Sequence, residues 1–129
     1  RVAGVYVPNG NPAPGEKYDY KLEWSEALEI QAAAMLRAEQ PFVICGDYNC
    51  IPGPDDCWDD TVWNTDALGL PETRAAFRRL KHLGLTEAFE ACDGRAHQYT
   101  FWDYQAGAFQ KDHGIRIDHV LACPRMTDR

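Results

Sequence analysis

The sequence lacks the features that mark disulfide-rich, zinc-binding and membrane-spanning proteins. Its five cysteines are odd in number and contain no C-x-x-C pair, so neither a disulfide framework nor a zinc site is expected. No stretch approaches the run of about 18 apolar residues that a transmembrane helix needs, and the first residues lack the long apolar region of a signal peptide. We therefore expect a soluble, cytoplasmic monomer with reduced cysteines and no membrane partner.

Positive charge is also scarce. Thirteen Lys and Arg residues against 20 Asp and Glu residues give a formal net charge of -7. This balance argues mildly against a protein that binds nucleic acid through bulk positive charge. An acidic cleft that collects divalent cations can nevertheless lie beside local Arg and Lys side chains that contact phosphate. The net charge alone therefore leaves nucleic-acid binding open.

The chain does have the composition of a folded domain. Its 129 residues are 45% hydrophobic and 12% aromatic, which is typical of a soluble globular protein and not of a disordered segment. A chain of this length is expected to form one compact unit.

The hydrophobic pattern predicts strand, helix and strand in the first third of the chain. Residues 2–7 form a β-branched run that predicts a buried strand. Apolar residues recur at helical spacing over residues 19–40, and Pro41 ends this helix. The apolar run at residues 42–45 predicts a second strand, which ends in a turn at Gly46.

A helical crossover normally makes the two strands parallel, so that their carboxyl ends meet at one edge of the sheet. Residues 6–9 and 47–49 should therefore lie close together. Ligand sites of open α/β sheets are usually built at this edge.

Weaker patterns follow in the second half. Residues 51–71 predict a long surface loop, residues 71–83 a helix that stops at Gly84, and residues 85–91 a further helical turn. Residues 99–104 and 115–123 have strand composition and predict a hairpin with a long tip.

The segment Gly46-Asp47-Tyr48-Asn49 places a carboxylate and a carboxamide two residues apart, so that in an extended conformation both point the same way. Asp47 could deprotonate a water for phosphodiester hydrolysis, and Asn49 could stabilise charge on the phosphoryl oxygens. The motif taken alone is more typical of an Asx turn that caps the strand.

Two further clusters also have two interpretations. Tyr6 and Asn9 offer a phenol and an amide that could donate to a phosphate oxygen, or they are a buried tyrosine and a turn asparagine. The aromatic run at residues 99–104 could form a pocket or stacking surface for a sugar or base, or an ordinary core strand.

The last cluster contains Asp118 within an apolar strand. Strand alternation puts Ile115, Ile117 and His119 on one face and Arg116 and Asp118 on the other. Asp118 should therefore be near solvent or held by a donor such as Arg116 or a histidine. Such a carboxylate can orient a catalytic imidazole, although His119, on the opposite face, is not expected to be that imidazole.

Five motifs carry a resemblance to a known family. They are Tyr-Val-Pro-Asn-Gly at 6–10, Lys-Tyr-Asp-Tyr-Lys-Leu at 17–22, Gly-Asp-Tyr-Asn at 46–49, Tyr-Thr-Phe-Trp-Asp-Tyr at 99–104 and Gly-Ile-Arg-Ile-Asp-His at 114–119. In this order they resemble the exonuclease III and AP endonuclease group of the endonuclease/exonuclease/phosphatase superfamily. The segment at 101–109 resembles the bacterial exodeoxyribonuclease III branch. The resemblance implies an α/β fold that is part of a four-layered sandwich, with two packed mixed β-sheets flanked by helices.

The resemblance also implies a function. It is that of a metal-dependent DNA phosphodiesterase of base-excision repair, a 3'-5' exodeoxyribonuclease and abasic-site endonuclease. The implied substrate is double-stranded DNA with abasic sites or 3' ends, and the implied cofactor is Mg²⁺, with Mn²⁺ as a substitute.

Individual residues receive roles from the same resemblance. Tyr6 and Asn9 would contact the scissile phosphate. Asp47 would orient or deprotonate the attacking water, and Asn49 would stabilise the transition state, both also as metal ligands. Asp118 would support a catalytic histidine. The positions expected to bind a flipped, base-less sugar are Phe101, Trp102, Ile115 and Ile117.

Two parts of the family pattern have no match between residues 1 and 129. They are an upstream strand with Asn and Glu metal ligands and a downstream Ser-Asp-His segment. We therefore expect residues 1–129 to be the C-terminal portion of one domain, incomplete at both ends and inactive alone. The alternatives are a superfamily relative that hydrolyses inositol or lipid phosphate esters, and a non-catalytic, degenerate scaffold.

Overall fold

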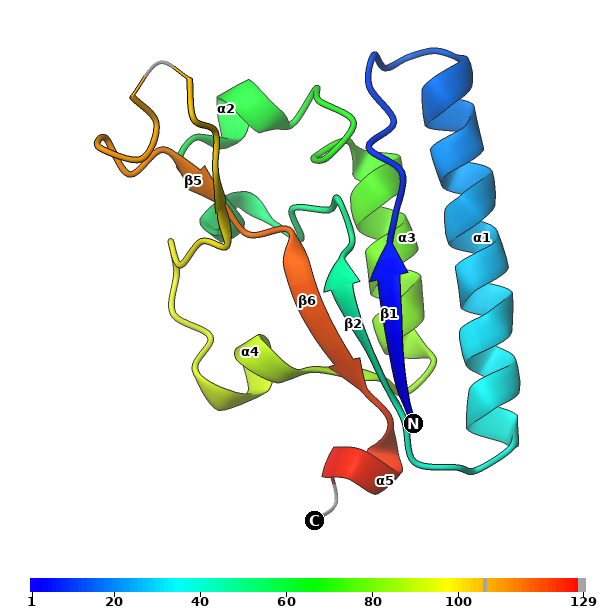
Figure 1. Ribbon diagram of the computed structural model, residues 1–129. Helices are drawn as coiled ribbons and strands as arrows, with labels where there is room; N and C mark the ends of the chain where they lie inside the picture. The colour runs from blue at the N-terminus through cyan, green and yellow to red at the C-terminus, as the bar shows by residue number, and fades with distance from the viewer. Residues whose placement is uncertain (106, 128–129) are drawn as a thin grey trace.

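The computed structural model describes residues 1–105 and 107–127 and contains one main β-sheet covered by helices on one face (Figure 1). Ala106, which belongs to the motif at 101–109, lies outside the described residues. The strand order of the sheet is β1-β2-β6-β3. Its strands are β1 (Val2–Tyr6), β2 (Val43–Asp47), β3 (Thr86–Glu87) and β6 (Asp118–Ala122).

The predicted parallel crossover is confirmed. Strand β1 pairs with β2 in parallel, whereas β6 is antiparallel to both β2 and β3. A second, two-stranded antiparallel sheet pairs β4 (Phe101–Trp102) with β5 (Gly114–Ile115). The predicted hairpin is therefore confirmed only at residues 101–102 and 114–115, because residues 118–122 pair in the main sheet instead. The α/β class and the mixed sheet follow from these pairings.

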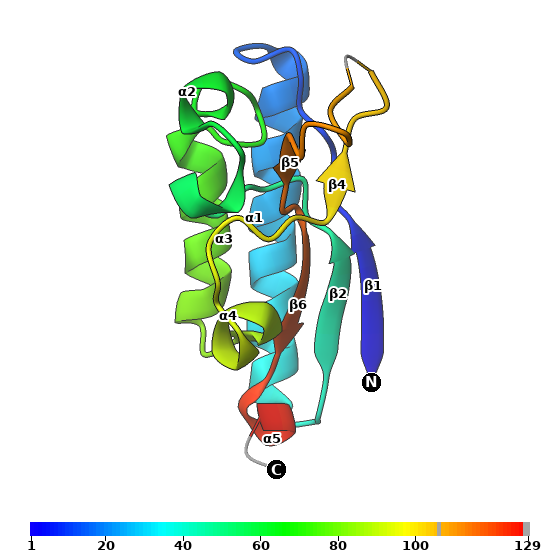
Figure 2. The ribbon, with the colours of Figure 1, turned by 90° about the vertical axis from the view of Figure 1, so that its left-hand side faces the viewer.

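Two long helices lie side by side on the covered face (Figure 2). They are α1 (Glu16–Arg37), three residues earlier at each end than the predicted helix, and α3 (Pro71–His82). The short helices are the 3₁₀ turn η1 (Pro54–Asp56), α2 (Asp60–Trp63), α4 (Ala88–Cys92) and α5 (Pro124–Thr127). The predicted loop at 51–71 thus contains two helical turns, and the segment predicted as helical at 85–91 begins as β3. In residues 1–105 and 107–127 no helix is long and apolar enough to span a membrane.

Strand β1 is half exposed, so the prediction of a buried strand is wrong. Val2 and Tyr6 are 73% and 72% exposed, whereas Ala3 and Val5 pack against the core between the sheet and the helices. The reason is that β1 is an edge strand whose second face is not covered by the helices (Figure 2). Side chains on this open face therefore remain accessible to a ligand.

Gly46 allows β1 and β2 to approach each other. Its φ is 141°, and a methyl group at this position would overlap the Val5 carbonyl oxygen. We expect Gly46→Ala to lower the free energy of unfolding by about 3 kcal/mol, measured by urea denaturation. Gly4→Ala, on β1 with nothing within 4 Å of the added methyl, is the control and should change the same quantity by less than about 1 kcal/mol. Equal unfolding midpoints for the two variants would contradict this role for Gly46.

Candidate active site

Three predicted site residues form one row across the open face of the sheet. Tyr6 on β1 pairs with Asp47 on β2, and Asp47 pairs with Asp118 on β6. Residues directly opposite on neighbouring strands have Cβ atoms about 5 Å apart. The structure therefore brings together a phenol and two carboxylates from distant parts of the sequence, since Tyr6 and Asp118 are separated by 112 positions.

Asp47 and Asn49 form an Asx turn. The Asn49 backbone N–H donates to Asp47 Oδ1 over 2.8 Å, and Asn49 has a φ of 43°. The Asx turn that the motif taken alone favours is therefore confirmed, and the segment is not extended. The turn does not exclude a reaction centre, because it uses one carboxylate oxygen, Oδ1, and fixes the orientation of the other.

The Asn49 side chain is held in place as well. It is buried, and its Nδ2 donates to the Val7 carbonyl oxygen over 2.6 Å. This bond connects the turn after β2 to the end of β1. The side-chain oxygen of Asn49 is the acceptor atom that the amide can still offer to a ligand.

The environment of Asp47 disfavours its charged form. Partial burial raises the pKa of the Asp47 carboxyl, and the Asp118 carboxylate raises this pKa further. The Asn49 N–H and the Lys21 ammonium act in the opposite direction. Two carboxylates directly opposite on antiparallel strands repel each other, so a cation or a protonated partner would stabilise the pair.

Tyr6 and Asn9 lie at the same edge. The exposure of Tyr6 shows that the alternative of a buried tyrosine is wrong. Asn9 is a turn asparagine, since its Oδ1 accepts from the Asn11 N–H over 3.1 Å. Asn11 in turn bonds to Asp66 and to the Ala67 N–H, which links the loop after β1 to the segment before α3.

Lys21 is a residue of this region that sequence reasoning missed. It is 1% exposed, and its ammonium donates to three backbone carbonyls. Burial lowers the pKa of Lys21 to about 8. The signal was present in the sequence, because helical spacing places position 21 on the same face of α1 as the buried Ala32 and the partly buried Leu28.

Arg116 does not bond to Asp118, so the second of the two predicted environments of Asp118, with Arg116 as donor, is not the one present. The buried Arg116 guanidinium instead bonds to Asp56 Oδ1 over 2.9 Å and to Glu87 Oε2 over 3.2 Å. The strand alternation fails here because the Arg116 N–H donates to the Asp56 carbonyl, and the β-strand is interrupted between Ile115 and Asp118. Asp118 is exposed, which confirms the first predicted environment, a position near solvent.

His119 faces away from Asp118 and is buried, in agreement with its predicted place on the opposite face. Its Nε2 lies 2.8 Å from the Cys50 carbonyl and its Nδ1 lies 3.3 Å from Arg116 Nη1. Since a carbonyl only accepts and a guanidinium only donates, these contacts fit a neutral ring with its proton on Nε2. The 4.0 Å approach of Nδ1 to Glu87 could favour a charged ring, but burial dominates and lowers the pKa of His119 to about 3.

This pKa predicts acid sensitivity. A histidine with a folded pKa near 3 and an ordinary unfolded pKa near 6.5 contributes a stability that is complete above pH 6.5 and is lost as the pH falls. The slope from this one group is up to about 1.4 kcal/mol per pH unit. We expect His119→Gln to flatten the dependence of the unfolding free energy on pH between 6.5 and 4, measured by urea denaturation. His82→Gln, exposed on α3, is the control, and identical pH profiles for the wild type and His119→Gln would contradict the prediction.

The residues expected to contact a sugar divide into two pairs. Ile115 and Ile117 are 2% and 4% exposed and belong to a core cluster with Ile51 and Leu68, so they offer a ligand almost no surface here. Phe101 is 45% exposed, and Trp102 is partly exposed.

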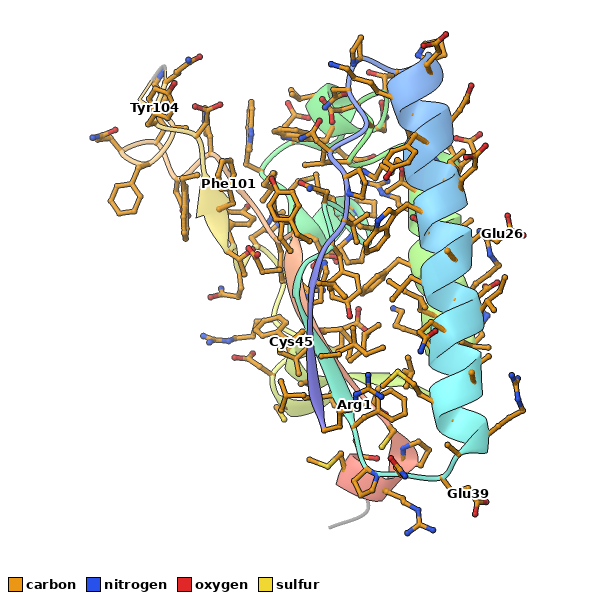
Figure 3. The ribbon with its side chains drawn as sticks, turned by 45° about the vertical axis from the view of Figure 1, so that its right-hand side comes forward. Arg1, Glu26, Glu39, Cys45, Phe101 and Tyr104 are labelled. Atoms are coloured by element: carbon orange, nitrogen blue, oxygen red, sulfur yellow. The ribbon has the colours of Figure 1, made fainter. Side chains whose placement is uncertain are left out.

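A loop of aromatic side chains extends from these two residues. Phe101 lies at the base of this loop and Tyr104 at its far end, away from the helices (Figure 3). Tyr104 and Phe109 are exposed, and Phe109 packs edge-on against Trp102 with ring centroids 5.6 Å apart. Thr100 Oγ1 accepts from the Ile117 and Asp118 N–H groups, so this loop is anchored next to the carboxylate row.

The oxygen atoms of the site suit a hard cation. Carboxylate and carboxamide oxygens from Asp47, Asn49 and Asp118 are ligands of the type that Mg²⁺ uses, usually one or two carboxylates with water and phosphate completing the shell. Within residues 1–105 and 107–127, however, no group of three His, Cys, Asp or Glu side chains is arranged to hold a metal ion. The chain's own residues therefore fit part of a metal site.

Comparisons with known proteins agree on one family. The model of the endonuclease/exonuclease/phosphatase family matches residues 1–129. An exodeoxyribonuclease of Bacillus subtilis is 28% identical over 99% of this chain and 50% of its own length. The AP endonuclease of Archaeoglobus fulgidus superposes with a TM-score of 0.92 at 31% identity, over 99% of this chain and 50% of that chain. A 3'-5' exonuclease of Neisseria meningitidis gives 0.93 at 32% identity, over 98% and 50%.

The chain thus spans about half the length of the relatives that it matches. The match nevertheless extends over nearly all of the chain, in sequence and in fold. The protein belongs to the endonuclease/exonuclease/phosphatase family.

Proposed function

We propose that the chain forms part of a metal-dependent DNA phosphodiesterase of base-excision repair, with 3'-5' exodeoxyribonuclease and abasic-site endonuclease activity. The observation that carries the proposal is the row of Tyr6, Asp47 and Asp118 on an open sheet face, bordered by Asn9 and Asn49. Hydrolysis of a phosphodiester needs a base for water and donors for the phosphoryl oxygens. This row supplies a base, the Asp47 carboxylate, and a donor, the Tyr6 hydroxyl, at one edge of the sheet.

Each residue then has a task in the reaction. Asp47, held by its Asx turn, accepts the proton of the attacking water through its free oxygen. Tyr6 and Asn9 donate hydrogen bonds to the scissile phosphate, and the Asn49 amide stabilises the transition state. Asp118 is exposed, and no histidine of residues 1–105 and 107–127 bonds to it. We therefore propose that it orients a catalytic histidine from outside residues 1–129.

We propose Mg²⁺, or Mn²⁺ in its place, as the cofactor, with Asp47 and Asn49 among its ligands. When bound, a divalent cation stabilises negative charge on the phosphoryl oxygens and lowers the pKa of a bound water. The raised pKa of Asp47 supports this assignment, because partial burial and the neighbouring Asp118 carboxylate outweigh the Asn49 N–H and the Lys21 ammonium.

The proposed substrate is double-stranded DNA with an abasic site or a 3' end. Two of the similar proteins are named as an AP endonuclease and a 3'-5' exonuclease. The exposed Phe101, Tyr104 and Phe109 offer aromatic surface on which a base or sugar can stack. The predictions of a monomeric and cytoplasmic protein remain part of this proposal.

The proposal is tested on the protein encoded by the complete gene. A duplex with one abasic site and an inositol phosphate are offered separately, each with Mg²⁺ and with EDTA. We expect cleavage of the duplex that depends on Mg²⁺ and at least tenfold slower turnover of the inositol phosphate. The reverse preference would favour the relative that hydrolyses inositol or lipid phosphates, and no cleavage of either would favour the non-catalytic scaffold.

A further inference from the structure

We propose that Lys21 is a positioning residue of this reaction, which fixes the loops after β1 and β2 relative to each other through the backbone carbonyls of Asn9 and Asn49. The identity of the reaction rests on the proposed function, whereas the contacts of Lys21 are observed in the structure whatever the reaction is.

The three acceptors of Lys21 come from three different segments. The Nζ atom donates to Asn9 O over 3.0 Å, to Asn49 O over 2.7 Å and to Ala67 O over 3.0 Å. An ammonium has three N–H donors and no acceptor, so this set uses all of them. None of the acceptors belongs to α1, which makes the contact a link between loops and not a feature of the helix.

The chain makes room for a lysine at this point. Gly10 has a φ of 89°, and a Cβ at this position would lie 2.6 Å from Lys21 Cδ. The glycine therefore lets the aliphatic stem pass under the loop after β1. An arginine could not replace the ammonium well, because its planar fork does not direct its donors towards three carbonyls around one point.

The contact acts on the residues that matter for the site. Asn9 and Asn49 are the two residues whose side-chain amides we assign to the phosphate and the transition state. Their backbone carbonyls are held by the same ammonium, while the Asn49 side chain is held by Val7. A displacement of about 1 Å in a catalytic group can lower a rate about 100-fold. Releasing these carbonyls should therefore affect catalysis more than binding.

The experiment uses the complete gene product with Lys21→Met, which keeps the length of the stem and removes the donors. We expect kcat on the abasic duplex to fall about 100-fold, with KM within about threefold of the wild type. Amide hydrogen exchange should accelerate at residues 9–11 and 48–51, while α3 keeps its protection. Gly10→Ala, which leaves the ammonium but obstructs its stem, should reproduce the effect on kcat in part.

A variant matched for stability separates positioning from folding. Leu80→Ala removes core packing in α3, at a cost of about 2–5 kcal/mol, but leaves the three hydrogen bonds of Lys21 in place. It should keep kcat within about threefold of the wild type at a temperature where it is folded. The proposal would be overturned by an unchanged kcat or unchanged loop exchange in Lys21→Met, or by an equal loss of kcat in Leu80→Ala. If Lys21→Met does not fold, the same measurements on Gly10→Ala replace it, and an unchanged kcat or unchanged loop exchange in that variant would overturn the proposal.

The two proposals fail differently. A wild-type protein that cleaves neither substrate refutes the proposed function, while the exchange comparison still decides whether Lys21 holds the two loops. A wild-type protein that cleaves the duplex, with Lys21→Met equally active, refutes the role of Lys21 alone.

Discussion

Asp47→Asn is expected to lower kcat for phosphodiester cleavage by about 10²–10⁴-fold, the usual contribution of a positioned general base. Asparagine keeps an oxygen that can accept from the Asn49 N–H, so the turn after β2 should persist. The substitution removes only the charge that accepts the proton. We therefore expect the unfolding midpoint of the variant to match that of the wild type or exceed it, because the repulsion from Asp118 is removed.

The control for this variant is Asp59→Asn. Asp59 also accepts from a backbone N–H two residues later, that of Thr61, over 3.0 Å, but it caps α2 on the surface. Its replacement removes one negative charge with the same side-chain chemistry, and kcat should stay within about twofold of the wild type. A wild-type kcat in Asp47→Asn would show that Asp47 does not act as the base.

Residues 1–129 produced alone are expected to cleave the abasic duplex at least about 10³-fold more slowly than the complete gene product. The removal of the divalent cation and of a catalytic histidine would each eliminate a contribution of about 10²–10⁴. The described residues contain no three-ligand metal group, and Asp118 has no histidine partner within them.

This comparison requires evidence that the isolated chain is folded, which circular dichroism and a cooperative urea transition provide. Addition of Mg²⁺ or Mn²⁺ to residues 1–129 should not restore the rate. Comparable rates for the chain and the complete gene product, per mole of protein, would show that residues 1–129 hold a sufficient site.

The part of the fold that positions the site was predictable because its signals are local. The run at residues 2–7, the helical spacing over 19–40 and the second apolar run define strand, helix and strand. The crossover rule then brings Tyr6 next to Asp47, as the register confirms. The turn at Asp47 was likewise available from the chemistry of Asx residues.

The errors arose where distant residues decide the conformation. Arg116 was assigned by strand alternation, yet its partners Asp56 and Glu87 lie 60 and 29 positions away. The Arg116 N–H also donates to the Asp56 carbonyl, and the strand is interrupted between Ile115 and Asp118. Periodicity contains no information about such partners.

Lys21 was missed for a different reason. Helical spacing places it on the buried face of α1, but a lysine alone does not indicate burial, because an unpaired buried ammonium is costly. The three partners of its ammonium are backbone carbonyls. Almost any residue of the chain can supply a backbone carbonyl. A carbonyl acceptor leaves no signature in the sequence.

A crystal structure of the complete Asp47→Asn protein with an abasic-site duplex tests the central claim most directly. We predict that the scissile phosphate lies about 3 Å from the Tyr6 hydroxyl and the Asn9 amide, over the face of the sheet that carries Asp118. A scissile phosphate bound away from this row, with Tyr6 and Asn9 free of contact, would contradict the assignment of the site.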